Sequence, residues 1–89
     1  MSQQFTKDPD ATLDYSIDWS KWLAGDTILT SEWSVPTGLT QVNVSNTTTK
    51  ATVWLSGGSA GQSYTVTNRI ITAGGRTDER SIIIRVENR

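Results

Sequence analysis

Cysteine and histidine are both absent from the 89 residues of the chain. Without cysteine, the chain has no disulfide, no thiol nucleophile and no thiolate metal ligand. Without histidine, it also lacks the usual general base and the commonest transition-metal ligand in proteins. Small secreted domains usually depend on disulfides, so this chain has to rely on its packed core or on assembly with partners.

An excess of charge is also missing, since 8 basic and 9 acidic residues give a formal net charge of −1. No basic surplus is available to neutralise phosphates, so we expect no binding to nucleic acid. No apolar run reaches the length of a membrane span or a signal-peptide core. We therefore expect that the chain is made in a cytoplasm and does not insert into a membrane. The length suits one domain and not two.

The strongest structural signal that is present is the stretch Ala60–Val86, where two runs rich in Val, Ile, Thr and Tyr flank Gly74 and Gly75. This pattern predicts a long antiparallel hairpin. One side of the hairpin is expected to face the core, because a one-residue slip would turn every apolar side chain outward. The residues on that side are Tyr64, Val66, Asn68, Ile70, Thr72, Ile82, Ile84 and Val86.

Four further strands are predicted upstream of the hairpin. The first begins at Leu13, and the other three span residues 27–35, 39–45 and 51–55. On the strand 27–35 we expect Leu29 to share one side with Trp33. A single helical turn is predicted near residues 19–24, with Asp18 as its cap and Gly25 at its end. Trp19, Trp22 and Leu23 would then close one end of the domain.

Six or seven mostly antiparallel strands with frequent turns are typical of an all-β, immunoglobulin-like β-sandwich. A small barrel is the alternative. Tyr64 lies where many such sandwiches carry a corner tyrosine that bonds to nearby backbone. Residues 1–10 are polar and contain Asp8-Pro9, so they are predicted to form a flexible N-terminal arm that only a partner orders. Residues 11–89 would form the single domain.

The outer face of the predicted hairpin carries Ile71 and Ile83 among polar and charged residues. Scattered surface apolar residues are ordinary, and that interpretation stays open. If Trp54 joins them, the set becomes a candidate protein-docking surface. Its residues are Trp54, Arg69, Ile71, Ile83 and Arg85.

No pattern in the chain indicates catalysis, a cofactor or a metal. The acidic residues are concentrated at Asp8, Asp10, Asp14 and Asp18, but their spacing matches no calcium loop, so solvation or pairing with lysine is favoured. The glycine-rich run 57–61 has no following lysine and precedes a strand, unlike a phosphate-binding loop. The four tryptophans are mostly expected in the core, which leaves Trp54 as a plausible exposed ring for stacking on a sugar.

Several segments together resemble a family of small tailed-phage and prophage proteins described as fibre–tail adaptors. They are Lys7–Ala11, Leu13–Tyr15, Asp18–Ser20, Trp22–Leu23, Gly25–Ile28, Ala51–Gly58, Tyr64–Asn68 and Gly75–Ser81. Each segment alone is weak, but the combination covers roughly residues 7–87 and is fairly specific.

The resemblance implies a non-enzymatic structural protein of the virion tail with an immunoglobulin-like fold. Such a protein would link the tail or baseplate to a receptor-binding fibre through protein–protein contacts, in several copies per virion, after synthesis in the host cytoplasm. Composition and spacing alone would not lead to a phage. They leave open a second class, an immunoglobulin-like module that binds a carbohydrate or another cell-surface ligand.

Overall fold

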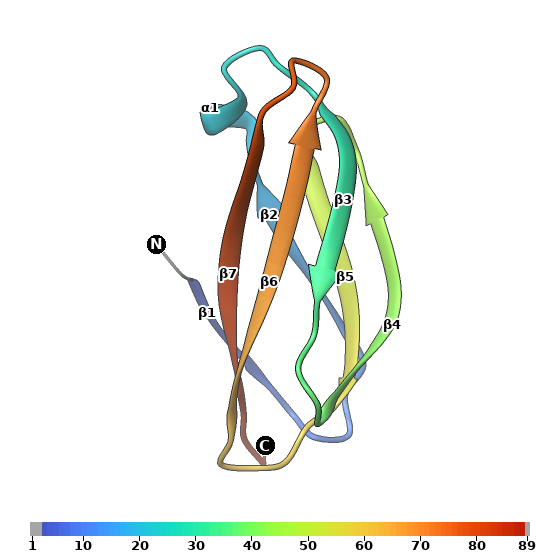
Figure 1. Cartoon of the computed structure of the whole chain (residues 1–89). Helices are drawn as coiled ribbons and strands as arrows, with labels where there is room; N and C mark the ends of the chain where they lie inside the picture. Colours follow the sequence, from blue (N-terminus) through green and yellow to red (C-terminus); the bar gives the residue numbers. More distant parts are fainter. Residues whose placement is uncertain (1–2, 89) are drawn as a thin grey trace.

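The computed structural model of the chain describes residues 3–88, which form seven strands and one helical turn arranged as two packed sheets (Figure 1). The elements in chain order are β1 (Gln3–Lys7), β2 (Leu13–Asp18), α1 (Ser20–Leu23), β3 (Ile28–Ser34), β4 (Leu39–Asn46), β5 (Lys50–Gly57), β6 (Ser63–Thr72) and β7 (Thr77–Val86). The first sheet has the order β1-β7-β6-β3 and the second the order β2-β5-β4. The two sheets share no strand, so the predicted sandwich is observed and the alternative barrel is not.

The hairpin predicted from Gly74 and Gly75 is the pair β6 and β7. Val66 lies opposite Ile82, and Tyr64 lies opposite Ile84, so the two inward sides meet in register. All the residues predicted to face inward are buried except Tyr64, which is half-buried. The Tyr64 hydroxyl accepts a 3.0 Å hydrogen bond from the backbone N–H of Ser59, as expected of a corner tyrosine.

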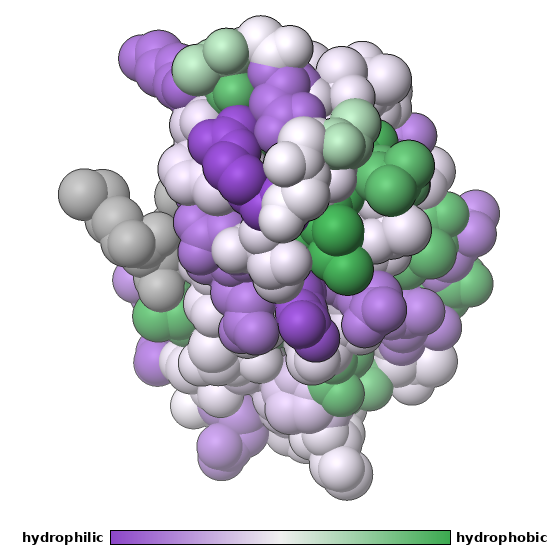
Figure 2. Space-filling model, turned by 45° about the horizontal axis from the view of Figure 1, so that its top comes forward, coloured by the Kyte–Doolittle hydropathy of each residue, from purple (hydrophilic) through white to green (hydrophobic). Residues whose placement is uncertain are grey.

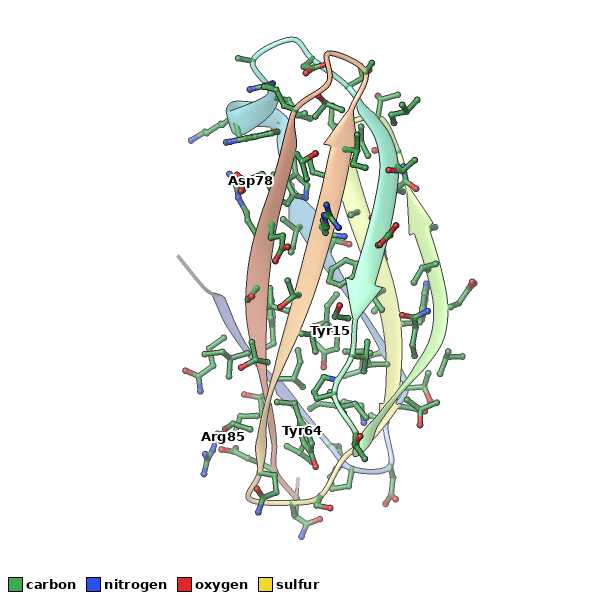
Figure 3. The ribbon with its side chains drawn as sticks, viewed as in Figure 1. Tyr15, Tyr64, Asp78 and Arg85 are labelled. Atoms are coloured by element: carbon green, nitrogen blue, oxygen red, sulfur yellow. The ribbon has the colours of Figure 1, made fainter. Side chains whose placement is uncertain are left out.

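The core lies between the sheets. The second sheet contributes alternate residues of β2 and β5 to it. Tyr15 lies opposite Val53, Ile17 lies opposite Ala51, and Leu55 is the next inward residue along β5; all of them are buried. Figure 3 shows Tyr15 lying between the sheets. Burial of each large aliphatic side chain contributes roughly 1.5–3 kcal/mol, so this alternation is the main source of stability.

The N-terminal segment differs from the irregular arm that the sequence predicts. Gln3–Lys7 form β1, which pairs in parallel with β7. Phe5 packs against Tyr15 with their ring centroids 5.2 Å apart. The buried ammonium of Lys7 donates to the carbonyl of Gly57 at 2.7 Å, which ties the first sheet to the end of β5. Burial lowers the pKa of Lys7, against the opposing effect of Asp8.

The reason for this difference is that the segment is held by partners distant in the sequence, which its own polar composition does not indicate. Residues 1–2, which were assigned to the same arm, lie outside the described residues. The flexibility of the arm in the isolated chain stays a prediction, and limited proteolysis of the monomer checks it.

One side chain on β3 also differs from its expected direction. The pairing of β3 with β6 shifts register between Ile28 and Thr30, which marks a β-bulge. Ile28 is therefore buried, while Leu29 is 65% exposed and does not share the half-buried side of Trp33. The sequence alternation holds on each side of the bulge and fails across it.

The helical turn α1 lies where the sequence predicts it, at one end of the sandwich (Figure 1). The carboxylate of Asp18 accepts a 2.9 Å hydrogen bond from the N–H of Ser20, which lowers the pKa of Asp18. Ala24 ends the turn with φ 50°, and Gly25 continues in the left-handed region at φ 94°.

Candidate docking surfaces

The outer face of the first sheet holds four of the five residues that the sequence proposes for docking. Arg69 and Ile71 come from β6, and Ile83 and Arg85 come from β7. All four occupy the positions between the buried residues of their strands. Figure 3 shows Arg85 pointing away from the sandwich. The structure therefore brings these four residues to one face.

Within that face the two isoleucines are well separated. Ile71 lies opposite Thr77 beside the turn, whereas Ile83 lies opposite Thr65 near the other end of the hairpin. Six residues along a strand correspond to about 20 Å. Arg69 lies between them, opposite Glu79 on one side and Glu32 on the other. The face thus has two half-exposed apolar points divided by a charged row.

Trp54 does not join the residues of the hairpin. It lies on β5 in the second sheet, opposite Asp14 and Asn43, and is 38% exposed. Because the neighbouring Val53 and Leu55 face the core, Trp54 faces outward from the opposite side of the sandwich. The five proposed residues therefore belong to two surfaces and not to one.

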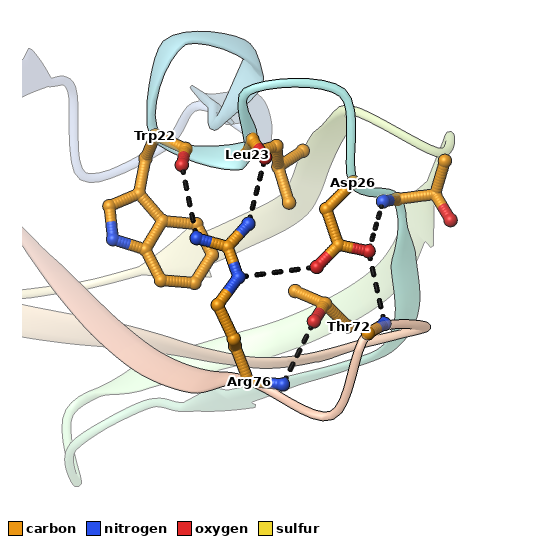
Figure 4. Close-up of polar contacts among 7 residues, drawn as sticks. Trp22, Leu23, Asp26, Thr72 and Arg76 are labelled. Carbon is orange, nitrogen blue, oxygen red and sulfur yellow. Dashed lines mark hydrogen bonds and ion pairs between the residues drawn. The ribbon is translucent and has the colours of Figure 1, made fainter.

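The end of the molecule that carries α1 is closed by a polar cluster (Figure 4). The guanidinium of Arg76 donates to the carbonyl of Leu23 at 2.7 Å and to that of Trp22 at 3.4 Å. It also donates to Asp26 at 3.2 Å and lies 4.3 Å above the ring of Trp22. The side chain of Arg76 thereby satisfies the last carbonyls of α1, which have no partner within the helical turn.

Asp26 completes this cluster as an acceptor. A hydrogen bond from the Thr72 hydroxyl, followed by N–H donors of Thr27 and Gly74 and by Arg76, lowers the pKa of Asp26 to about 2. The N–H of Gly74 is 3.0 Å from the carboxylate. Asp26 therefore fixes the β6–β7 turn against the segment that follows α1.

A buried amide, which the sequence reasoning placed inward without a role, joins this end to the core. The Asn68 carbonyl oxygen accepts from the indole N–H of Trp19 at 2.9 Å. Its amide group donates to the Ser31 hydroxyl and to the carbonyl of Glu32. The signal was an asparagine at an inward position among apolar residues, because such an amide needs partners in the core.

A third surface is apolar and was not singled out from the sequence. Three of the most exposed large hydrophobic residues lie on the edge strands β3 and β4, namely Leu29 (65%), Val42 (55%) and Val44 (41%). Figure 2 shows hydrophobic side chains gathered on the side of the molecule where β3 and β4 lie. Of the eight residues of β4, only Leu39 is buried.

Residues 3–88 hold neither a metal-binding cluster nor a membrane-spanning helix. No group of three or more acidic, histidine or cysteine side chains in that range is placed to hold a metal ion. No helix in the same range is long and apolar enough to cross a membrane.

Comparison with known proteins gives a family match and a structural match. The family model described as "Podophage GP4 fiber-tail adaptor protein gp77" matches residues 7–85. Among solved structures, the "Solution structure of the PKD domain from KIAA 1837 protein" is similar to the chain with a TM-score of 0.57 and 21% identity. That match covers 98% of this chain and 80% of the other. No curated protein matches the chain significantly. At this identity the structural match shows the fold alone, and it confirms the immunoglobulin-like β-sandwich.

Proposed function

The chain belongs to the podophage GP4 fiber-tail adaptor family, and from this premise we propose that it links the phage tail or baseplate to a receptor-binding fibre through protein–protein contacts. The observation that carries the proposal is the family match over residues 7–85, which runs from the end of β1 to the last residues of β7. The family is one of structural adaptors, which points away from an enzyme.

An adaptor needs two separate contact surfaces on one rigid body. The outer faces of the two sheets lie on opposite sides of the sandwich, and each carries residues proposed for docking. Ile71 and Ile83, with Arg69 and Arg85, supply one surface, and Trp54 supplies the other. We include in the proposal that several copies act in one virion, because fibres are often multimeric.

A binding experiment tests the proposed function directly. The fibre protein and the tail protein of the same phage are mixed with and without this chain, and complexes are separated by size. The expected result is a complex of fibre and tail protein only when the chain is present. The adaptor role is wrong if the chain binds neither protein.

Variants of the hairpin face test the first surface. Ile71→Asp and Ile83→Asp are made singly, because about 20 Å separates the two positions and one partner need not cover both. Each should leave a folded domain, since both side chains are half-buried on an outer face. Thr12→Asp, at an exposed position between β1 and β2 and away from the hairpin, is the control. Unchanged assembly of both isoleucine variants removes this surface from the proposal but leaves the adaptor role.

One observation favours a second candidate function, a module that binds carbohydrate. Trp54 is partly exposed between a carboxylate, Asp14, and an amide, Asn43, and sugars bind to such combinations of an aromatic face and hydrogen-bonding groups. Binding of a glycan should change the tryptophan fluorescence, and Trp54→Ala should abolish the change. A broad glycan screen of the folded protein without any such signal rejects this function.

A further inference from the structure

The strand β4 is an open edge of the second sheet. Within residues 3–88 it pairs only with β5, and seven of its eight residues are exposed. An edge strand presents a row of unpaired N–H and C=O groups, which is a template for another extended chain. The main-chain groups on the side of β4 that faces away from β5 therefore have no partner strand in the described residues.

The direction of these groups follows from the hydrogen bonds of the β4–β5 loop. The N–H of Thr47 donates to the carbonyl of Lys50 at 2.8 Å. Bonded and non-bonded pairs alternate in an antiparallel ladder, so the pair Val44–Val53, three positions further on, directs its main-chain groups outward. The N–H of Val44 instead bonds to the side chain of Asn43 at 2.9 Å, which agrees with this assignment.

The edges of the two sheets differ in how they are protected. Proteins commonly place charged residues on edge strands to prevent pairing with other chains. The edge β2 carries Asp14 and Asp18, and the edge β3 carries Glu32. The sequence of β4, LTQVNVSN, has no charged residue and no proline. An uncharged strand thus meets no electrostatic penalty at β4.

We propose that β4 binds an extended, uncharged segment of a second virion protein by strand addition, which extends the three-stranded sheet to four. Main-chain hydrogen bonds would supply the affinity, and alternate apolar side chains of the added strand would contact Val42 and Val44. The proposal rests on the proposed adaptor function and names the chemistry of one of its two contacts.

A second copy of the chain is a poorer occupant than an extended segment. The pairing of β4 with β5 shifts register between Gln41 and Asn43, so β4 carries a bulge. In a symmetric β4–β4 pair each copy would bring its own bulge, and only the short run Asn43–Asn46 of each strand would lie free of it. A segment without tertiary structure of its own can follow the bulge and pair along the whole strand.

Amide hydrogen exchange tests the proposal. The full chain is mixed separately with the fibre protein and with the tail protein of the same phage. With one of them, amides of residues 39–46 should exchange at least about tenfold more slowly, while those of β3 change by less than about twofold. Binding with protection only outside β4 overturns strand addition and leaves the adaptor role. Absence of binding to both proteins overturns the adaptor role, and strand addition with it.

A pair of lysine variants sharpens the test. Val44→Lys places a charge on the β4 edge, and Leu29→Lys makes a similar change at an exposed position on the neighbouring edge β3. Affinity for the protein that protects β4 should fall by at least about tenfold for Val44→Lys and by less than about twofold for Leu29→Lys. Val44→Pro, which removes the outward N–H, should weaken binding in the same way. The proposal is contradicted if all three variants bind with the affinity of the natural chain.

Discussion

The α1 end of the sandwich and the edge strand β4 differ in how far their polar groups are paired within the chain. At the α1 end, Arg76, Asp26 and Asn68 satisfy one another or nearby main-chain groups, and a second arginine, Arg80, lies 4.3 Å above the ring of Trp19. Along β4, the groups directed away from β5 have no partner strand in the described residues, and two of their N–H groups bond only locally, Leu39 to the carbonyl of Pro36 and Val44 to the side chain of Asn43.

This difference separates stability from assembly. Polar groups that are paired within the chain hold the fold, and their loss leaves a buried partner without a hydrogen bond. Polar groups that are left unpaired at an edge contribute little to the fold and are available to another protein. The comparison predicts that changes at the α1 end lower the free energy of unfolding, whereas changes at β4 alter binding alone.

The largest effect on stability is expected at Trp19. This side chain is fully buried and donates to Asn68, so Trp19→Ala should lower the free energy of unfolding by about 3–5 kcal/mol. The matched control is Trp54→Ala, at a partly exposed tryptophan, which should cost clearly less. Urea denaturation measures both variants, and equal losses would contradict the contrast between the two regions.

Arg76 should give the next largest effect. Arg76→Met keeps much of the apolar stem but removes the donor to the carbonyl of Trp22, one of the two donors to that of Leu23 and the bond to Asp26, and a loss of about 1–3 kcal/mol is expected. Arg85→Met is the control, because the ion pair of Arg85 with Glu87 is exposed and should be worth less than about 1 kcal/mol. Thermal unfolding at neutral pH compares the two. Equal melting temperatures of Arg76→Met and Arg85→Met would show that Arg76 does not stabilise the α1 end.

Asp26 should make the α1 end sensitive to acid. The pKa of Asp26 in the folded chain is about 2, below its ordinary value of 3.8, so the unfolded chain binds more protons between these values. The stabilisation is complete above about pH 4 and is lost as the pH falls towards 2. Melting temperatures of Asp26→Asn should therefore fall less steeply over this range than those of the natural chain. Parallel curves for the two proteins would show that Asp26 is not the titrating group.

Much of the fold could be predicted because burial enforces alternation. In the β6–β7 hairpin, Val66 and Ile82 are buried, and a one-residue slip would expose them, so pattern and register had to agree. The position of α1 was predictable for a local reason, because Asp18 accepts from the N–H of Ser20 and Gly25 allows the chain to leave the turn, although the N-cap is Trp19 and the C-cap is Ala24.

The remaining features depend on contacts that are distant in the sequence. β1 is held by β7 and by the bond from Lys7 to Gly57, and nothing in its polar sequence indicates either partner. The bulge at Leu29 breaks the alternation without a glycine or a proline to mark it. Trp54 shows the pattern of an outward residue, but only the assignment of β5 to the second sheet separates it from Ile71 and Ile83.

The most direct test of the separation between the two regions is the number of copies of this chain in purified virions of two variants. Val44→Lys should change stability by less than about 0.5 kcal/mol, because its side chain is on the surface, and yet be depleted from virions at least about tenfold. Arg76→Met should melt earlier and still be incorporated at a temperature where it is folded. Normal incorporation of Val44→Lys, with loss of a folded Arg76→Met, would contradict the account.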